Sequence, residues 1–321
     1  MPARTKKRPA TAVAMLFVTL ALAASGCEGG DGSTPPARAR TPSASASVPP
    51  AHVLAVKIDN VVPARPPTGL DKADIVYVER VEAGLSRILA VYSSRLPPVV
   101  GPVRSARESD LELLRQFGRP TLAFSGAQSK LLPVIDAAPV NPVPPGKAPG
   151  DAYFRSQDRA APHNLYLRPE RVLRKTSGVN AATYAGFTFG PEPAGGKPTA
   201  TYSVRYPAAR FAFTWSPQRA QWLVAMDGTP SRTQAGQQLG AATVVVQYVN
   251  VHPSKFHDRS GNISPYTETV GSGTALVLRD SKAHKAEWKR PTAESGTTFT
   301  TPDGRPMAFA PGQVWIVYAA R

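Results

Sequence analysis

The distribution of proline constrains this 321-residue chain more than any other feature of its sequence. The chain contains 34 prolines, about twice the usual share of roughly 5%, and many of them stand in pairs or short tracts. Because proline lacks a backbone N–H and breaks helices, long helices do not run through such tracts. The pattern argues against a long coiled coil or an all-helical bundle, and favours short elements joined by rigid loops.

The first 27 residues have the features of an export signal. Basic residues near the start precede an apolar stretch over residues 10–24, which is shorter than the about 20 residues of a membrane-spanning helix but suits a secretory signal. The stretch ends in Ala24-Ser25-Gly26-Cys27, and Cys27 is the one cysteine of the chain. Small residues directly before a cysteine resemble the lipobox of bacterial lipoproteins. That resemblance implies that Cys27 carries a lipid and begins the mature chain.

We therefore expect a lipoprotein signal peptide over residues 1–27, followed by a flexible tether over residues 28–50, which is rich in Gly, Ser, Thr, Ala and Pro. A plain signal peptide with an incidental cysteine is the alternative. The lipid would hold the protein on the extracytoplasmic face of a bacterial membrane. The formal charge of the whole chain is +16, and removal of the signal takes away four basic residues and no acidic ones, which leaves +12. This charge suits anionic lipid head groups and wall polymers there, and nucleic acid is not an expected partner. A basic surface without any partner is the other interpretation of this charge.

Beyond the tether, the residue patterns predict two regions of different character. The first, over residues 51–189, has short apolar runs typical of strands and two amphipathic stretches typical of helices. The expected strands cover 53–58, 74–80, 86–93 and 121–124, and the expected helices 108–117 and 129–137. The second, over residues 200–321, has strand patterns at 211–215, 221–226, 243–250, 274–278 and 314–318. The predicted fold class is α+β or α/β, with a mixed α/β N-terminal domain followed by a β-rich C-terminal domain.

An ordered series of motifs resembles one protein family. The series consists of Ile58-Asp59-Asn60, Ala64-Arg65-Pro66, Gly69-Leu70, Ala73-Asp74-Ile75-Val76-Tyr77, Val81-Glu82, Gly84, Arg87, Gly101-Pro102-Val103-Arg104-Ser105-Ala106-Arg107 and Ala161-Pro162-His163-Asn164. It resembles the YerB-type bacterial lipoproteins, a family defined as a domain of unknown function (DUF3048). Near the end of the chain, Pro311-Gly312-Gln313-Val314-Trp315 resembles the C-terminal domain of that family. The resemblance implies a location and a two-domain layout, and implies no activity.

The sequence departs from the family pattern at three places. The family more often has two glycines where this chain has Ala83-Gly84, and often has histidine and glycine around Phe124-Ser125. A carboxylate often follows the tyrosine directly, where this chain has Val78 and then Glu79. A shift of one place along a strand moves a side chain to the other face, so a family role does not transfer to these positions.

Candidate site residues of the first region gather on loops that follow strands, where binding and chemistry usually occur. They are Asp59, Asn60, Arg65, Glu82, Arg87, Arg104, Ser105, Arg107 and His163. The four arginines favour an anion, because the planar guanidinium fork recognises carboxylate or phosphate at two points. Peptidoglycan stem peptides offer carboxylates, and wall polymers or lipid head groups offer phosphates. The equally weighted alternative pairs these arginines internally with carboxylates of the same domain.

For catalysis, the strongest candidates are Glu82 and Asp59. Two carboxylates that flank a sugar bond suit a glycosidase or lytic transglycosylase, provided that one is held protonated as the acid. A glutamate in a turn is more often a cap or an ion-pair partner. Ser105 with His163 is a weaker nucleophile and base pair, because no nucleophile-elbow pattern surrounds the serine.

The remaining chemistry-bearing residues predict no metal and no cofactor. His252, His257 and Asp258 fall in a proline-containing loop and match no standard spacing of metal ligands. No phosphate-cradling loop and no dinucleotide fingerprint is present. The four tryptophans of the second region could stack on sugars, but at strand positions they are more typical of a core.

The leading hypothesis is thus a lipid-anchored module that binds an anionic envelope ligand, peptidoglycan or a wall polymer, through arginine-rich loops. A cell-wall lytic enzyme using Glu82 is the second hypothesis. A scaffold that binds envelope proteins through its β-rich domain is the third.

Overall fold

A computed structural model describes residues 52–258 and 260–321. The predicted signal peptide, Cys27 and the tether lie outside these residues. The described residues belong to one compact unit. Within its described residues, no helix is both long enough and apolar enough to cross a bilayer.

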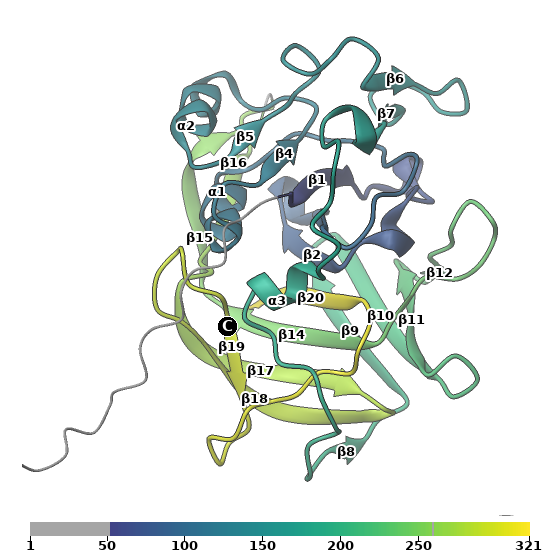
Figure 1. The fold of residues 1–321 in the computed structure, drawn as a ribbon, viewed down its shortest axis with the longest axis vertical. Helices are drawn as coiled ribbons and strands as arrows, with labels where there is room; N and C mark the ends of the chain where they lie inside the picture. The colour runs from purple at the N-terminus through teal and green to yellow at the C-terminus, as the bar shows by residue number, and fades with distance from the viewer. Residues whose placement is uncertain (1–51, 259) are drawn as a thin grey trace, which may run out of the picture. The chain divides into compact units, whose positions relative to one another are not determined.

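One mixed sheet of eleven strands takes residues from both halves of the sequence (Figure 1). Its order is β19 (Thr298–Thr300), β18 (Lys282–Arg290), β17 (Gly271–Arg279), β14 (Thr243–Val249), β20 (Val314–Ala320), β2 (Ile75–Arg80), β3 (Ser86–Tyr92), β1 (Leu54–Asp59), β4 (Thr121–Ala123) and β5 (Asn141–Pro142), with β8 (Lys197–Pro198) beside β18. The last strand, β20, pairs in parallel with β14 on one side and with β2 on the other. The division into domains at 51–189 and 200–321 stays a prediction, and strands from both ranges are hydrogen-bonded in this sheet.

Both faces of the large sheet are covered, and each cover has its own apolar core. The α-helices of the described residues are α1 (Glu108–Leu114), α2 (Leu132–Ala137) and α3 (Ala181–Tyr184), and they pack on one face. A second sheet covers the other face with β9 (Thr201–Tyr206), β10 (Ala209–Ser216), β11 (Gln221–Met226), β12 (Thr229–Pro230) and β13 (Gly240–Ala241). Because side chains alternate along a strand, β1 gives Ala55 to the helix-side core and Val56 to the sheet-side core. Burial on both faces explains why β1 is an almost unbroken apolar run.

The predicted fold class is confirmed: a mixed sheet with few helices in the first half of the chain is followed by an antiparallel, β-rich second half. The helix expected over 108–117 is α1 continued by a 3-10 turn over Arg115–Phe117. Three of the four tryptophans, Trp222, Trp288 and Trp315, are at most 2% exposed, so the core interpretation is confirmed for them.

The proline-containing loop expected around His252 and His257 is wrong. These residues belong to β15 (Val251–His257), which pairs with β16 (Ile263–Thr267) as a separate two-stranded hairpin. Proline is tolerated because the register shifts between Pro253 and His257 and because a two-stranded hairpin has free edges. The hairpin packs on α1, where the Thr267 N–H donates to Ser109 Oγ at 2.9 Å.

Candidate functional site

In the three neighbouring strands β1, β2 and β3, the side chains that face the helices are apolar toward one end of the strand and charged toward the other. In β1 these side chains are Ala55, Lys57 and Asp59, so the apolar core gives way to charge at the end of the strand. Arg87 is the second residue of β3 and is the cross-strand neighbour of Asp59 on one side and of Glu79 on the other. Because opposite residues on one face lie about 5 Å apart, the register alone gathers this cluster.

An extended segment over residues 101–107 brings further arginines to the same place. The Arg104 N–H donates to the Lys57 carbonyl at 2.8 Å, and the Arg104 carbonyl accepts from the Ser125 N–H at 2.9 Å. These two bonds fix the backbone of Arg104 on both sides. The segment begins at Gly101, where a Cβ would lie 2.7 Å from Tyr166 Cδ1, so only glycine allows this approach.

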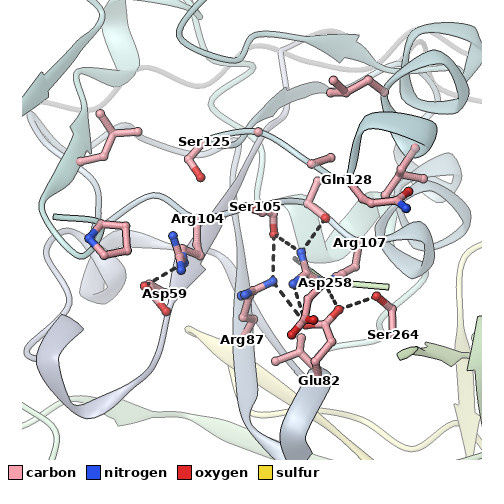
Figure 2. Close-up of a pocket in the computed structure, with 18 of the residues that line it drawn as sticks. Asp59, Glu82, Arg87, Arg104, Ser105, Arg107, Ser125, Gln128, Asp258 and Ser264 are labelled. Atoms are coloured by element: carbon pink, nitrogen blue, oxygen red, sulfur yellow. Dashed lines mark hydrogen bonds and ion pairs between the residues drawn. The ribbon is translucent and has the colours of Figure 1, made fainter. Parts of the chain in front are cut away.

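The structure places six of the nine predicted site residues around one cavity of about 1460 Å³ (Figure 2). The six are Asp59, Glu82, Arg87, Arg104, Ser105 and Arg107. Asp59 and Glu82 therefore line the same cavity, each beside different arginines. His163 joins the group through Asp59, with its Nδ1 at 2.8 Å from Asp59 Oδ2.

Asn60 and Arg65 lie outside this cavity and have structural partners. Asn60 Nδ2 donates to Ser86 Oγ at 2.9 Å, and Arg65 Nη2 donates to the Asn60 carbonyl at 2.7 Å. Arg65 also forms an ion pair with Asp227 at 2.8 Å, at the turn after β11. For Arg65 the structure therefore favours the internal ion-pair interpretation.

Glu82 is a buried, fully engaged carboxylate. Arg107 binds it at two points, Nε to Oε1 and Nη2 to Oε2, both at 2.6 Å. The Ser264 hydroxyl of β16 also donates to Oε1, so the second half of the chain completes this contact. Burial alone would raise the pKa of Glu82, but the hydrogen bonds and charge of Arg107, with the help of Ser264 and Arg87, lower it to about 2. Glu82 is therefore ionised at neutral pH.

Three of the four arginines that line the cavity, Arg87, Arg104 and Arg107, differ in how many of their donors are used. Arg107 donates from Nε and Nη2 to Glu82, and from Nη1 to the Ala106 carbonyl at 2.9 Å. Arg87 makes a single hydrogen bond within the described residues, at 3.4 Å from Nη1 to the Ser105 carbonyl, and Glu82 Oε2 lies 4.0 Å away. Arg104 uses only Nε, at 3.2 Å from Asp59 Oδ2, which leaves both Nη atoms without a partner in residues 52–258 and 260–321. Figure 2 shows these two guanidinium groups along the same cavity.

Formal charge around the cavity is balanced, whereas hydrogen-bonding capacity is not. Four arginines and four carboxylates line it: Arg87, Arg104, Arg107, Arg155, Asp59, Glu82, Glu108 and Asp258. The carboxylates have donors within the protein; Glu108 accepts from Ser254 at 2.5 Å, and Asp258 accepts from the N–H groups of Ser260 and Asn262. The groups left without partners among the described residues are N–H donors of Arg87 and Arg104. Burial, with the charges of Arg107 and Arg104, lowers the pKa of Arg87 to about 10, so it remains a cation.

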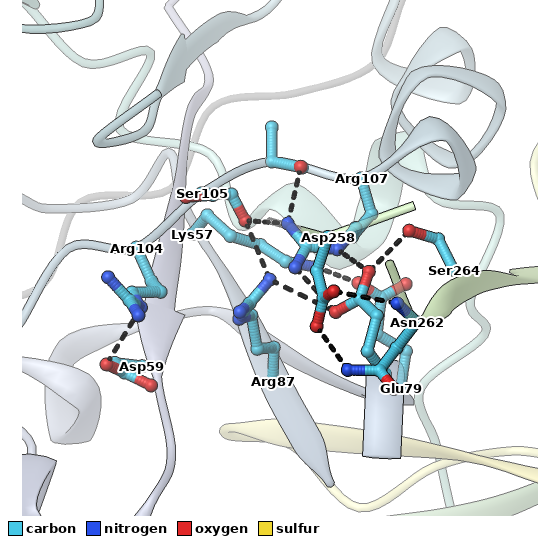
Figure 3. A network of polar contacts seen from close by, with 12 residues as sticks. Lys57, Asp59, Glu79, Arg87, Arg104, Ser105, Arg107, Asp258, Asn262 and Ser264 are labelled. Carbon is cyan, nitrogen blue, oxygen red and sulfur yellow. Dashed lines mark hydrogen bonds and ion pairs between the residues drawn. The ribbon is translucent and has the colours of Figure 1, made fainter. Parts of the chain in front are cut away.

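A buried charged cluster beneath the cavity is the main feature that sequence reasoning missed (Figure 3). Lys57 is fully buried and donates to Glu79 and, at 2.7 Å, to Asp110 Oδ1. The other Asp110 oxygen accepts from the Arg107 N–H at 2.7 Å, which connects the cluster to the cavity arginine. A lysine inside the apolar run of β1 and a glutamate two places after Tyr77 were the available signals.

Two further catalytic and metal candidates gain no support from the geometry. His163 is bonded to Asp59, and within the described part of the chain the Ser105 hydroxyl makes no hydrogen bond to that histidine. His252 stacks on Tyr266 with ring centroids 5.1 Å apart. His257 Nδ1 lies 2.8 Å from the backbone carbonyl of the following residue.

Comparisons with known proteins agree with this architecture. The model of the family described as "Protein of unknown function (DUF3048) N-terminal domain" matches residues 41–182, and that of its C-terminal domain matches residues 202–316. A protein of Bacillus subtilis (strain 168) named "Putative lipoprotein YerB" is 25% identical over 280 residues, covering 82% of this chain and 80% of its own length. The crystal structure of YerB from Bacillus subtilis superposes with a TM-score of 0.68 at 20% identity, over 86% of this chain and 97% of that one. The chain belongs to the DUF3048 family of proteins of unknown function.

Proposed function

We propose that this protein is a lipoprotein, anchored through Cys27 on the extracytoplasmic face of a bacterial membrane, that binds an anionic envelope ligand in the cavity described above. The ligand is a carboxylate or phosphate group of peptidoglycan or of a wall polymer. The lipobox-like residues before Cys27 support the anchor, as does the name of the Bacillus subtilis relative.

One observation carries the proposed ligand class: Arg87 and Arg104 line a single cavity with donors that have no acceptor among the residues that the structure describes. The Arg87 side chain is only 13% exposed, and leaving the donors of a partly buried cation without acceptors is costly. An anion supplies the acceptors, and two guanidinium groups hold it from more than one direction.

The same geometry gives the lytic hypothesis little support. A glycosidase needs one carboxylic acid that stays protonated until it is used. Glu82 is ionised, with its pKa lowered to about 2, and both of its oxygens are bound by Arg107. Its arrangement suits an anchor for Arg107 rather than a proton donor.

The test is co-sedimentation of the chain from Ser47 to Arg321 with purified peptidoglycan and with wall polymer, followed by mass analysis of the released and retained material. This part is one compact unit with its own core, so we expect it to fold alone. Arg104→Gln should weaken binding at least tenfold. Arg305→Gln is the matched control, because it removes the same charge from a side chain that is 66% exposed and outside the cavity.

Three results distinguish the hypotheses. Retention on an unaltered polymer that depends on Arg104, and not on Arg305, supports the proposal. Soluble fragments that disappear with Glu82→Gln would replace it with the lytic enzyme. If the protein neither binds nor cuts either polymer, the envelope-ligand proposal falls and a protein partner becomes the better hypothesis.

A further inference from the structure

We infer that the ligand of this cavity is an amphipathic phosphate, with its head on Arg87 and Arg104 and an apolar body along a second set of lining residues. The inference rests on the proposed function and narrows its ligand class from any anionic envelope group to a phosphoryl group that carries an apolar chain.

The polar part of the cavity suits a phosphoryl head. Besides the free donors of Arg87 and Arg104, the hydroxyl-bearing residues Ser105 and Ser125 line the same space, and both are only partly buried. A phosphate offers three acceptor oxygens, so it can receive bonds from both arginines and from a hydroxyl together. Gly126, beside Ser125, also lines the cavity and has open space where a Cβ would stand.

A second set of lining residues is apolar and open to solvent. Leu132 of α2 is 38% exposed, and the side chains of Pro145, Pro149 and Pro162 are exposed at the same cavity. Tyr153 of β6 (Tyr153–Arg155) also lines the cavity, and its hydroxyl already donates to the Val143 carbonyl at 2.6 Å. Apolar side chains left in water beside a polar site mark the place where the apolar part of a ligand binds.

The size of the cavity agrees with a ligand larger than a simple anion. Its volume is about 1460 Å³, whereas pockets for small molecules typically span roughly 300–1,000 Å³. A phosphate group alone would leave the apolar lining residues exposed to water. An alkyl or isoprenoid-like chain attached to that group would cover it, and the transfer of each methylene from water tightens binding about fourfold.

The experiment measures the affinity of the chain from Ser47 to Arg321 for inorganic phosphate, butyl phosphate and octyl phosphate by calorimetry, with octyl phosphate kept below its aggregation concentration. Octyl phosphate should bind at least tenfold more tightly than butyl phosphate. Arg104→Gln should weaken all three phosphates by a similar factor. Leu132→Ser should reduce the octyl to butyl ratio at least threefold.

Val134→Ser is the matched control for Leu132→Ser. Both residues lie on α2 and both are 38% exposed, but only Leu132 lines the cavity. A ratio that falls with Leu132→Ser and is unchanged with Val134→Ser supports the inference. Equal affinity for the three phosphates, or equal loss in the two variants, overturns it.

The wall-polymer binding assay tests the proposed function independently of this inference. If polymer binds in an Arg104-dependent way but chain length has no effect on phosphate binding, the inference is overturned and the proposed function stands. If neither polymer nor any phosphate binds, both are overturned.

Discussion

Glu82 and Arg107 form a two-point ion pair, in which Arg107 Nε and Nη2 each donate to a separate Glu82 oxygen at 2.6 Å. This parallel geometry is the strongest that an arginine makes with a carboxylate. It also uses the donors that a ligand would need. Two arginines that stand three places apart in the sequence therefore have different roles: Arg107 holds the turn at Glu82, and Arg104 faces the cavity.

Arg107→Met should lower the free energy of unfolding by about 3–5 kcal/mol, because it leaves the Glu82 carboxylate buried without its counter-charge. The double variant Arg107→Met with Glu82→Leu should recover most of this loss, since it removes the stranded charge as well. Urea denaturation of the three proteins measures both effects. A loss below about 1 kcal/mol in the single variant would show that the pair does not hold the turn.

The low pKa of Glu82 in this pair predicts that the free energy of unfolding falls in acid. The folded pKa of Glu82, about 2, lies below its ordinary value of 4.5, so the unfolded chain takes up this proton first as the pH falls. The stability from ionised Glu82 is fully present above about pH 4.5 and is lost as the pH falls through 2, on the order of 3 kcal/mol in all. The Glu82→Gln variant should not show this loss when the free energy of unfolding is followed from pH 6 to pH 2.

The raised pKa of Glu79 predicts a change in the opposite direction: the free energy of unfolding falls as the pH rises. Burial, with the neighbouring Asp110 charge, raises the pKa of Glu79 from 4.5 to about 7 although Lys57 opposes the shift. Because the folded state keeps this proton longer than the unfolded chain, its contribution is fully present below about pH 4.5 and is lost as the pH rises through 7. Wild-type stability should decline from pH 5 to pH 8, and Glu79→Gln should flatten that decline. An unchanged slope in the variant would place the titrating group elsewhere.

The strands that could be predicted are those with apolar runs, such as β1, β14 and β20. β18 was missed although it has period-two alternation, because its exposed residues Lys285, Glu287 and Lys289 outweigh the buried Ala286 and Trp288 in any local average. The pairing of β20 with β2 brings together segments more than 200 residues apart, and no local pattern specifies such a partner.

For the candidate site, residue type and loop position were informative, whereas side-chain direction was not. Arg65 and Arg104 look alike in sequence, yet one is paired to Asp227 and the other lines the cavity. The partners Lys57 and Asp110 are separated by 53 residues, and only the packing of α1 on the sheet joins them. Strand parity could have placed Glu79 on the face of Tyr77, because residues two apart share a face.

Ala83 occupies a place where glycine suits the backbone better. It has φ 55° and ψ 20°, in the left-handed region, within the turn from Val81 to Leu85, which costs an L-residue about 1–2 kcal/mol. Ala83→Gly removes this strain at some entropic cost to the folded state, so thermal unfolding should show a gain of up to about 1 kcal/mol. The next residue should respond oppositely: a Cβ at Gly84 would lie 2.5 Å from Pro207 Cβ, and Gly84→Ala should cost at least about 2 kcal/mol.

Arg87 separates a ligand-binding role from an internal ion-pair role more sharply than any other residue. If its guanidinium stabilised the fold, Arg87→Met would cost several kcal/mol, as Arg107→Met should. With one hydrogen bond of 3.4 Å and a carboxylate at 4.0 Å, we expect instead a change in the free energy of unfolding of less than about 1 kcal/mol, because the apolar side chain keeps the packing and removes unused buried donors. Binding of the envelope ligand should fall at least tenfold in the same variant. Urea denaturation and polymer co-sedimentation of one preparation give both numbers, and a large loss of stability together with unchanged binding would assign Arg87 to the fold and leave Arg104 without its partner in recognition.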